Sequence, residues 1–544
     1  MVAALLHRCL SCLPGTRVAP AKASAAERWP IEVAYLTDVE GNLRYFERWL
    51  ATTARIVRYD KEGNLELAHA NAYFVYGGDV VDKGPGDIRL CRLLTRLKKR
   101  YPDRVALLCG NRDLNKLRLS AELDASDLAW PIEEIPAPHW DPKASTLKQH
   151  LEKVAEQRGL PGGASQANTR PERLKYMLQH TLGCPDTFEH RRQEVALLRG
   201  DNVADVTDDQ VADSFVAEAA PGGGGALREY LEVASLAALL GNTLFVHGAV
   251  DVHSMGLVPV DGTRFEMPGA PGSRSLEDLK FEERFVRYDD VARWVVALNA
   301  FLRRGLADHA ARPTWDAARR TRGGEALLAA QNRCAVLGRS IVSNCFADGG
   351  TITSAAALAG RTEAEKKAAS DPQAYERMCS DPRDADLAAW LRCGGVRRMV
   401  VGHKPSGDSP AVLCSRFTGL EVVSADTSYS DVTADDDRGM AVAGLLLQGD
   451  SLHSTHSVVY GILRDGRKHE ARLRTLGGSA DGTGGDPYIG SEAGGGWWVK
   501  ALVAPTGGAR EPSYLLCRGA GRKVEYMDVP RSKMAESGGR TAAK

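Results

Sequence analysis

The residues with the clearest chemical potential lie in Gly78-Asp79-Val80-Val81-Asp82-Lys83-Gly84, directly after an apolar run that ends at Tyr76. A carboxylate just past the carboxyl end of a buried strand lies where open α/β sheets bind their ligands. Asp79 can use both of its oxygens, so it could bridge two metal ions about 3.5–4 Å apart, the spacing of two-metal hydrolytic sites. The alternative is a simple Gly-Asp turn between a strand and a helix, and this stretch alone does not decide between the two.

Four further stretches repeat this arrangement, in which an apolar run ends in Gly, Asp, Asn or His. In chain order they are Asp38-x-Glu40, Gly110-Asn111-Arg112-Asp113, His247-Gly248 and Gly402-His403-x-Pro405. Carboxylate oxygens, amide oxygens and imidazole nitrogens together suit divalent ions such as Mn, Fe, Zn or Mg. Each residue also has a structural alternative. Asn111 could cap the helix that follows it, either histidine could be a hydrogen-bonded residue at a strand end, and Asp113 is expected to serve as a local partner for a loop or helix.

The apolar runs that precede these residues are typical of strands. The predicted strands are 31–36, 72–76, 105–109, 243–246 and 398–401. Helical spacing of apolar residues predicts one helix after residue 42 and another over 87–100. Because strands and helices alternate, we expect an α/β layered domain. Further strands are predicted over 439–473, where they would close a second sheet.

The pattern becomes helical between about residues 114 and 240, with breaks such as Pro221-Gly222-Gly223. We interpret this region as a helical insertion that covers the carboxyl edge of the sheet. The α/β domain as a whole is predicted to span 31–475. Residues 476–544 are predicted to comprise a Gly-rich linker, a short β segment and a basic tail.

Composition limits the partners and the compartment. The chain of 544 residues has 70 Lys+Arg and 70 Asp+Glu, so no overall field would recruit nucleic acid, and it has no run of about 18 apolar residues that would span a membrane. Its 11 scattered cysteines suit reduced thiols in an intracellular protein. Residues 1–30 begin with a basic, acid-free stretch that fits a transit peptide, with a disordered N-terminus as the alternative. We expect a cytoplasmic location, or a chloroplast or mitochondrial one if a transit peptide is present.

Taken together, the five motifs resemble those of the calcineurin-like metallophosphoesterase superfamily, which read DxH, GDxxDRG, GNHE, a lone His-Gly and a final GHxH or GHxP. The resemblance covers roughly Val33 to Asp426, with insertions between the motifs. Pro405 makes the last motif similar to that of the branch containing Ser/Thr protein phosphatases and diadenosine-tetraphosphate hydrolases. The resemblance implies a two-sheet α/β sandwich flanked by helices, with metal ions at the strand ends.

The resemblance also implies a set of metal ligands and a reaction. Asp38 and Glu40 would hold a first divalent ion, and Asp79 would bridge it to a second. The second ion would also be held by Asn111, His247 and His403. A hydroxide bound to this dinuclear centre would attack phosphorus in a phosphorylated protein, nucleotide or small molecule.

Three residues depart from the superfamily pattern. Glu40 stands where a His ligand is usual, and its oxygen donors favour Mn or Mg over softer ions. Lys83 stands where an Arg usually contacts phosphate, and it can supply charge without the planar fork of a guanidinium. Arg112 stands where a His usually protonates the leaving group. Because Arg cannot release a proton near neutral pH, Arg112 would instead stabilise developing charge, oriented by Asp82.

The sequence therefore predicts a metallophosphoesterase, a hydrolase of phosphoric ester bonds that is most active on good leaving groups. Lys83 and Arg112 would clamp the phosphate, and Asp82 would orient Arg112. The alternative is a catalytically impaired phosphoesterase fold that serves as a binding or scaffold protein, and the departures at Glu40 and Arg112 motivate it.

Overall fold

The computed structural model describes residues 30–138, 144–264, 284–332, 336, 340–344, 385–414, 418–505, 511–520 and 523–534. The predicted transit peptide lies outside these residues except for Pro30. Among the described residues, none of the helices has the length and apolar character needed to cross a membrane.

Ten strands form the larger sheet among the described residues, and β1 (Ile31–Leu36) is the third strand from one edge. On one side β4 (Ala72–Tyr76) and β5 (Val105–Leu107) run parallel to β1. On the other side β1 pairs antiparallel with β13 (Val442–Ser451). The antiparallel half continues through β14 (Ser454–Ile462), β15 (Lys468–Leu476), β17 (Trp497–Val503), β18 (Ser513–Ala520) and β19 (Lys523–Pro530), and β16 (Glu492–Gly494) pairs with β17.

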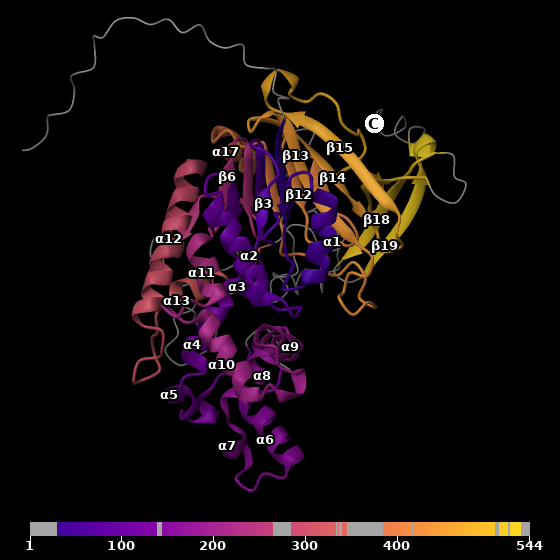
Figure 1. The fold of residues 1–544 in the computed structure, drawn as a ribbon. Coiled ribbons are helices and arrows are strands. Elements are labelled where there is room, and N and C mark those ends of the chain that lie inside the picture. The colour runs from indigo at the N-terminus through magenta and orange to yellow at the C-terminus, as the bar shows by residue number, and fades with distance from the viewer. Residues whose placement is uncertain are drawn as a thin grey trace, which may run out of the picture.

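Two features of this sheet differ from the sequence-based expectation. The strands over 439–473 do not close a second sheet, because β13 pairs with β1 and brings β14 and β15 into the first one. Residues 476–544 contribute more strand than the short segment expected, since β17, β18 and β19 extend the same sheet (Figure 1). Alternation of apolar residues predicts a strand but not its partner, which long-range pairing decides.

The second sheet has the order β11 (Ala411–Cys414), β12 (Glu421–Ser424), β10 (Arg398–Val401), β7 (Thr243–Val246) and β6 (Ala237–Leu240). Its three central strands are parallel. The inner faces of the two sheets share one buried core, in which the rings of Tyr35 and Phe245 stack with centroids 5.9 Å apart. The predicted two-sheet α/β sandwich flanked by helices is therefore confirmed.

Helices cover the outer faces of the sandwich. On the first sheet, α1 (Leu43–Thr53) lies close to β4, since the ring centroids of Trp49 and Phe74 are 5.6 Å apart, and α2 (Asp87–Arg100) packs nearby. On the second sheet, α12 (Val291–Ala311) contacts β6, and it meets α17 (Ala385–Cys393) where Trp294 approaches Trp390.

The predicted helical insertion forms a bundle with its own buried core, next to one end of the sandwich (Figure 1). Its helices are α4 (Leu119–Glu122), α5 (Ala125–Leu128), α6 (Leu147–Arg158), α7 (Gly163–Ala167), α8 (Arg170–Tyr176), α9 (Thr187–Arg199) and α10 (Asp208–Ala219). The helical pattern ends before residue 240, because α11 (Ala226–Val233) packs on α2 and 237–240 is β6. A short apolar run such as 237–240 suits a helix or a strand equally well.

Candidate metal centre

The loops that follow β1, β4 and β10 carry an unusual backbone conformation at the predicted site residues. Asp38, Glu40, Asp79 and His403 have positive φ angles of 53°, 54°, 53° and 67°, and Asp82 has 117°. Each such residue costs of order 1–3 kcal/mol and persists only where its surroundings impose it. Here the loops hold each other, because Asp38 N donates to Gly78 O at 3.0 Å and Glu40 N donates to Asp79 O at 3.1 Å.

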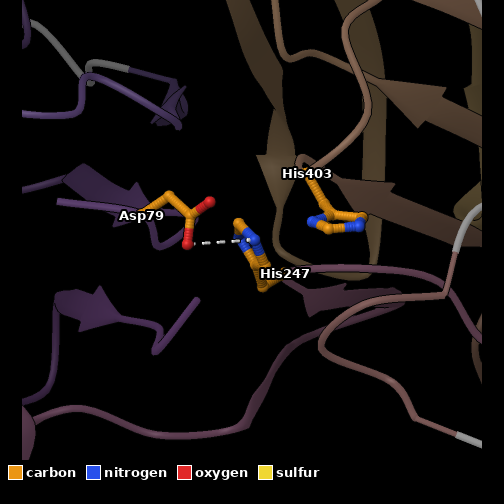
Figure 2. Close-up of side chains that lie close together, drawn as sticks. All are labelled: Asp79, His247 and His403. Carbon is orange, nitrogen blue, oxygen red and sulfur yellow. Dashed lines mark ion pairs between the residues drawn. The ribbon is translucent and has the colours of Figure 1, made fainter. Parts of the chain in front are cut away.

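Asp79, His247 and His403 converge at the end of the sandwich, with one ligand atom of each within 4.8 Å of the others. Figure 2 shows His247 between the other two side chains, with its Nε2 3.4 Å from Asp79 Oδ1. Asn111 completes the group, since its Oδ1 lies 2.9 Å from His403 Nδ1 and 3.3 Å from His247 Nε2. These four side chains are the complete set predicted to hold the second ion.

Both sheets contribute to this group. Asp79 follows β4 and Asn111 follows β5, whereas His247 follows β7 and His403 follows β10. Asn111 does not cap a helix, because Gly110 is the N-cap of α3 (Asn111–Asn115). The amide oxygen of Asn111 is therefore directed to the two imidazoles.

The electrostatics of the group suit a cation. Burial alone would raise the pKa of Asp79, but His247 and Arg112 hold it below its ordinary value. Burial would likewise lower the pKa of His247, yet Asp79 and Asp38 raise it to about 10, whereas burial and His247 lower the pKa of His403 to about 3. A proton on His247 thus offsets buried negative charge at the place where a divalent ion would do so.

The donor set also fits a divalent ion. It offers a carboxylate oxygen, an amide oxygen and two imidazole nitrogens, which suit Mn, Fe or Zn. His247 Nδ1 lies 2.8 Å from Gly77 O, so it donates there and leaves Nε2 directed at the group. A backbone partner of this kind fixes the tautomer and orientation of metal-binding histidines.

Asp113 holds the loop that carries Asp79. Its Oδ2 accepts from Asp79 N at 3.0 Å and from Gly110 N at 2.8 Å, and its Oδ1 accepts from Val80 N at 2.8 Å. These contacts confirm the predicted role of Asp113 as a local partner for a loop.

The predicted ligands of the first ion lie beside this group but are differently engaged. Asp38 Oδ2 accepts from Thr37 Oγ1 at 2.5 Å and from His403 N at 3.1 Å. Glu40 Oε1 lies 2.8 Å from Lys83 Nζ and 2.8 Å from Arg112 Nε. Among the described residues, Asp38 and Glu40 do not join Asp79 in one ligand cluster.

Arg112 faces Asp82, as the sequence predicted, with Nη1 3.3 Å from Asp82 Oδ2. Sequence reasoning missed Lys116, whose Nζ lies 2.7 Å from the same oxygen. Lys116 comes four residues after Arg112, and this spacing places two side chains on one face of a helical segment, so it was a usable signal. Burial would lower the pKa of Arg112, but Glu40 and Asp82 raise it well above the ordinary value.

Three further residues near the centre come from the loop after β12. Tyr429 accepts a hydrogen bond from Lys83 Nζ at 3.0 Å. Arg438 Nη2 donates to the backbone oxygen of Asp38 and lies 3.8 Å from Glu40 Oε2. Asp426 lies close enough to raise the pKa of Asp38, and only burial has a larger effect on that pKa. The motif resemblance reaches only to Asp426, and no local pattern marks the other two.

The helical insertion reaches the same loops. Thr187, at the start of α9, donates to the backbone oxygen of Asp82, and Glu194 accepts from Ile88 N at 3.0 Å. Arg191 pairs with Asp87 at 3.0 Å. The insertion therefore contacts the edge of the sandwich at the loop that carries Asp82.

The comparison with known proteins found matches only among solved structures. No protein-family model matches the chain, and no curated protein matches it. Among 18 matching chains of solved structures, a cold-active protein-tyrosine phosphatase from a psychrophilic Shewanella is 13% identical and has a TM-score of 0.32, with 81% of this chain and 80% of that chain covered. A serine/threonine phosphatase from Saccharomyces cerevisiae with similarity to human PP5 is 10% identical and has a TM-score of 0.27, with 77% and 73% covered. Both neighbours are phosphatases, but at these TM-scores the likeness carries no functional argument.

Proposed function

We propose that this protein hydrolyses phosphate esters at a divalent metal centre held by Asp79, Asn111, His247 and His403. The observation that carries this proposal is the convergence of these four side chains from two sheets, with donor atoms of Asp79 and both histidines within 4.8 Å. The order of the sequence motifs supports the same reaction class.

The residues around the group supply the remaining requirements. When bound, a divalent ion would lower the pKa of a water molecule and polarise a phosphoryl oxygen. Arg112 and Lys83 add positive charge beside the group, and their side chains retain 15% and 18% exposure, which leaves them accessible to substrate. Asp82 and Lys116 are almost fully buried and hold Arg112 in place.

Arg112 determines which substrates suit the site. Since its guanidinium keeps its proton, it stabilises negative charge on a leaving group but does not protonate it. General acid catalysis typically contributes about 10²–10⁴-fold. We therefore expect aryl phosphates and phosphoanhydrides to react much faster than alkyl phosphates. Phosphoprotein, nucleotide and small-molecule substrates are all compatible with this preference.

The number of bound ions and their identity are predicted from the resemblance and from the types of donor atom. The resemblance implies two ions, and the oxygen-rich donors Asp38 and Glu40 favour Mn or Mg for the first. That position requires Glu40 to be available, whereas its Oε1 is paired with both Lys83 and Arg112. The dinuclear centre, like the intracellular location, stays a prediction.

Hydrolysis of p-nitrophenyl phosphate by the purified chain with added Mn²⁺ tests the proposal. We expect Asp79→Asn and His247→Ala to lower kcat/KM by at least about 10²-fold, since the first removes the charge of a direct ligand and the second removes a direct ligand. His453→Ala changes an exposed histidine remote from the group and serves as the matched control. Full activity in both site variants would refute the assignment.

The binding or scaffold alternative is favoured by one observation, which is that Glu40 engages both cations that would otherwise contact phosphate. It predicts a chain that binds Mn²⁺ through His247 and His403 but turns over no phosphate monoester or diester. A panel of such esters, measured on protein whose bound metal has been quantified, separates the two functions.

A further inference from the structure

The three residues that depart from the superfamily pattern contact one another. Glu40 Oε1 lies 2.8 Å from Lys83 Nζ and 2.8 Å from Arg112 Nε. The Glu40 side chain is only 2% exposed, so the anion of this cluster is withdrawn from water, whereas its two cations keep part of their exposure. Charges paired in such surroundings interact more strongly than on a surface. The three departing residues therefore form one contacting group in the site.

The cluster also covers the side of Asp79 that a second ion would need. Asp79 Oδ1 faces His247 Nε2 at 3.4 Å, and Asp79 Oδ2 faces Arg112 Nε at 3.6 Å. A carboxylate that bridges with both oxygens gives one of them to each ion. Here the oxygen away from the histidines is directed at a guanidinium.

The other donor atoms of the first position are only partly engaged, since Glu40 Oε2 is buried and accepts no hydrogen bond from the described residues. Glu40 Oε2 faces a third cation, since Arg438 Nη2 lies 3.8 Å away and also donates to the backbone oxygen of Asp38. Asp38 Oδ2 already accepts from Thr37 Oγ1 and from His403 N. A divalent ion on Glu40 and Asp38 would thus be placed beside three positive side chains, and like charges at such distances repel.

We propose that Lys83, Glu40 and Arg112 form a fixed ion-pair cluster that replaces the first metal ion, so that the centre binds a single divalent ion. That ion would be held by Asp79, Asn111, His247 and His403. The inference rests on the proposed function only in requiring that this metal site exists. In such a centre a phosphate would be bound by one ion on the histidine side and by the cations of Arg112 and Lys83 on the other.

Metal stoichiometry tests the inference without reference to activity. The chain is saturated with Mn²⁺ and freed of loosely bound ions. Bound Mn²⁺ is then counted by elemental analysis and native mass spectrometry. We expect one ion per chain, which is lost in His247→Ala. The electron paramagnetic resonance spectrum should show the resolved hyperfine pattern of an isolated Mn²⁺ and no broadening from a neighbouring ion.

The double variant Glu40→His, Arg112→His restores the superfamily residue at two of the three departing positions and removes the cluster. We expect it to bind a second Mn²⁺ and to show the broadened spectrum of a coupled pair. Thermal unfolding checks that it folds. If it does not, Lys83→Gln with Arg112→Gln provides the same readout, because Glu40 is then released from both cations.

The outcomes separate the two proposals. Two coupled ions in the unchanged chain would overturn the cation cluster and leave the proposed phosphoesterase intact. One ion that persists in His247→Ala would overturn it too, because the ion would then be bound elsewhere. No bound ion at saturating Mn²⁺ would overturn both. Esterase activity with a single ion that depends on His247 supports both.

Discussion

Asp113 offers the sharpest test of how the candidate centre is positioned. Its carboxylate accepts three backbone N–H groups, from Asp79, Val80 and Gly110, at 2.8–3.0 Å. In Asp113→Asn the amide oxygen can replace Oδ2 and keep the bonds to Asp79 N and Gly110 N. The new NH₂ group then faces the N–H of Val80, so that one hydrogen bond is lost and the other two lose their charge.

These losses set the expected magnitude. Hydrogen bonds to charged groups contribute about 1.5–3 kcal/mol and those between neutral groups about 1 kcal/mol, so the lost bonds alone would lower the free energy of unfolding by about 3–5 kcal/mol. Removal of a buried charge whose pKa is raised to about 7 regains about 4 kcal/mol above that pH, so the net change in stability should be small. Because Asp113 positions a ligand without binding the ion, we also expect about 10–100-fold weaker Mn²⁺ binding. Burial and Asp79 raise the pKa of Asp113 to about 7, so both quantities are measured at a pH above it.

The assay combines urea denaturation with calorimetric titration of Mn²⁺. Asp486→Asn is the matched control, because Asp486 also accepts from two backbone N–H groups and one hydroxyl, at 2.7–3.1 Å, in the loop between β15 and β16. That variant should lose some stability and keep its Mn²⁺ affinity. Unchanged Mn²⁺ affinity in folded Asp113→Asn would refute the argument that Asp113 places the Asp79 ligand.

Three other predictions concern the remaining structure. Burial lowers the pKa of His309 to about 4 from 6.5, so the unfolded chain binds more protons below pH 6.5. His309 should then contribute a fall of about 2 kcal/mol to the free energy of unfolding in urea between pH 7.5 and 5, and His309→Gln should reduce the total fall by about that amount. Arg398 pairs with Glu421 at 2.6 Å in the core, so Arg398→Met should cost about 3–5 kcal/mol in the same assay, and adding Glu421→Leu should restore most of it. A Cβ on Gly110 would overlap the Asp79 carboxylate, so Gly110→Ala should weaken Mn²⁺ binding about 10-fold or more in a calorimetric titration, and unchanged affinity would contradict this.

The local pattern of apolar residues predicted many of the strands and helices. The strands that end before Asp38, Asp79, Asn111, His247 and His403 all form, because buried runs of β-formers need no distant information to be recognised. The helices after residue 42 and over 87–100 likewise form as expected. What local pattern does not encode is the partner of each strand, and β13 to β15 were assigned to the wrong sheet for that reason.

The candidate site was likewise predicted only in part. The residue types and their order indicated which side chains would gather, but not that Glu40 would pair with Lys83 and Arg112. Neither the approach of Arg438 nor that of Tyr429 has a sequence signal, because these contacts join segments far apart in the chain. Pairing between side chains of opposite charge depends on the tertiary fold, and a sequence with 70 residues of each sign offers too many combinations.

The contribution of both sheets to one ligand group has a consequence for biosynthesis. Asp79, Asn111 and His247 are synthesised well before His403, which follows the central strand β10 of the second sheet. A nascent chain therefore carries an incomplete set of donors until that strand has been made and has paired with β7. An ion that binds only the folded chain adds its binding free energy to stability. Metal binding would thus distinguish chains whose two sheets have packed together from chains that are still folding.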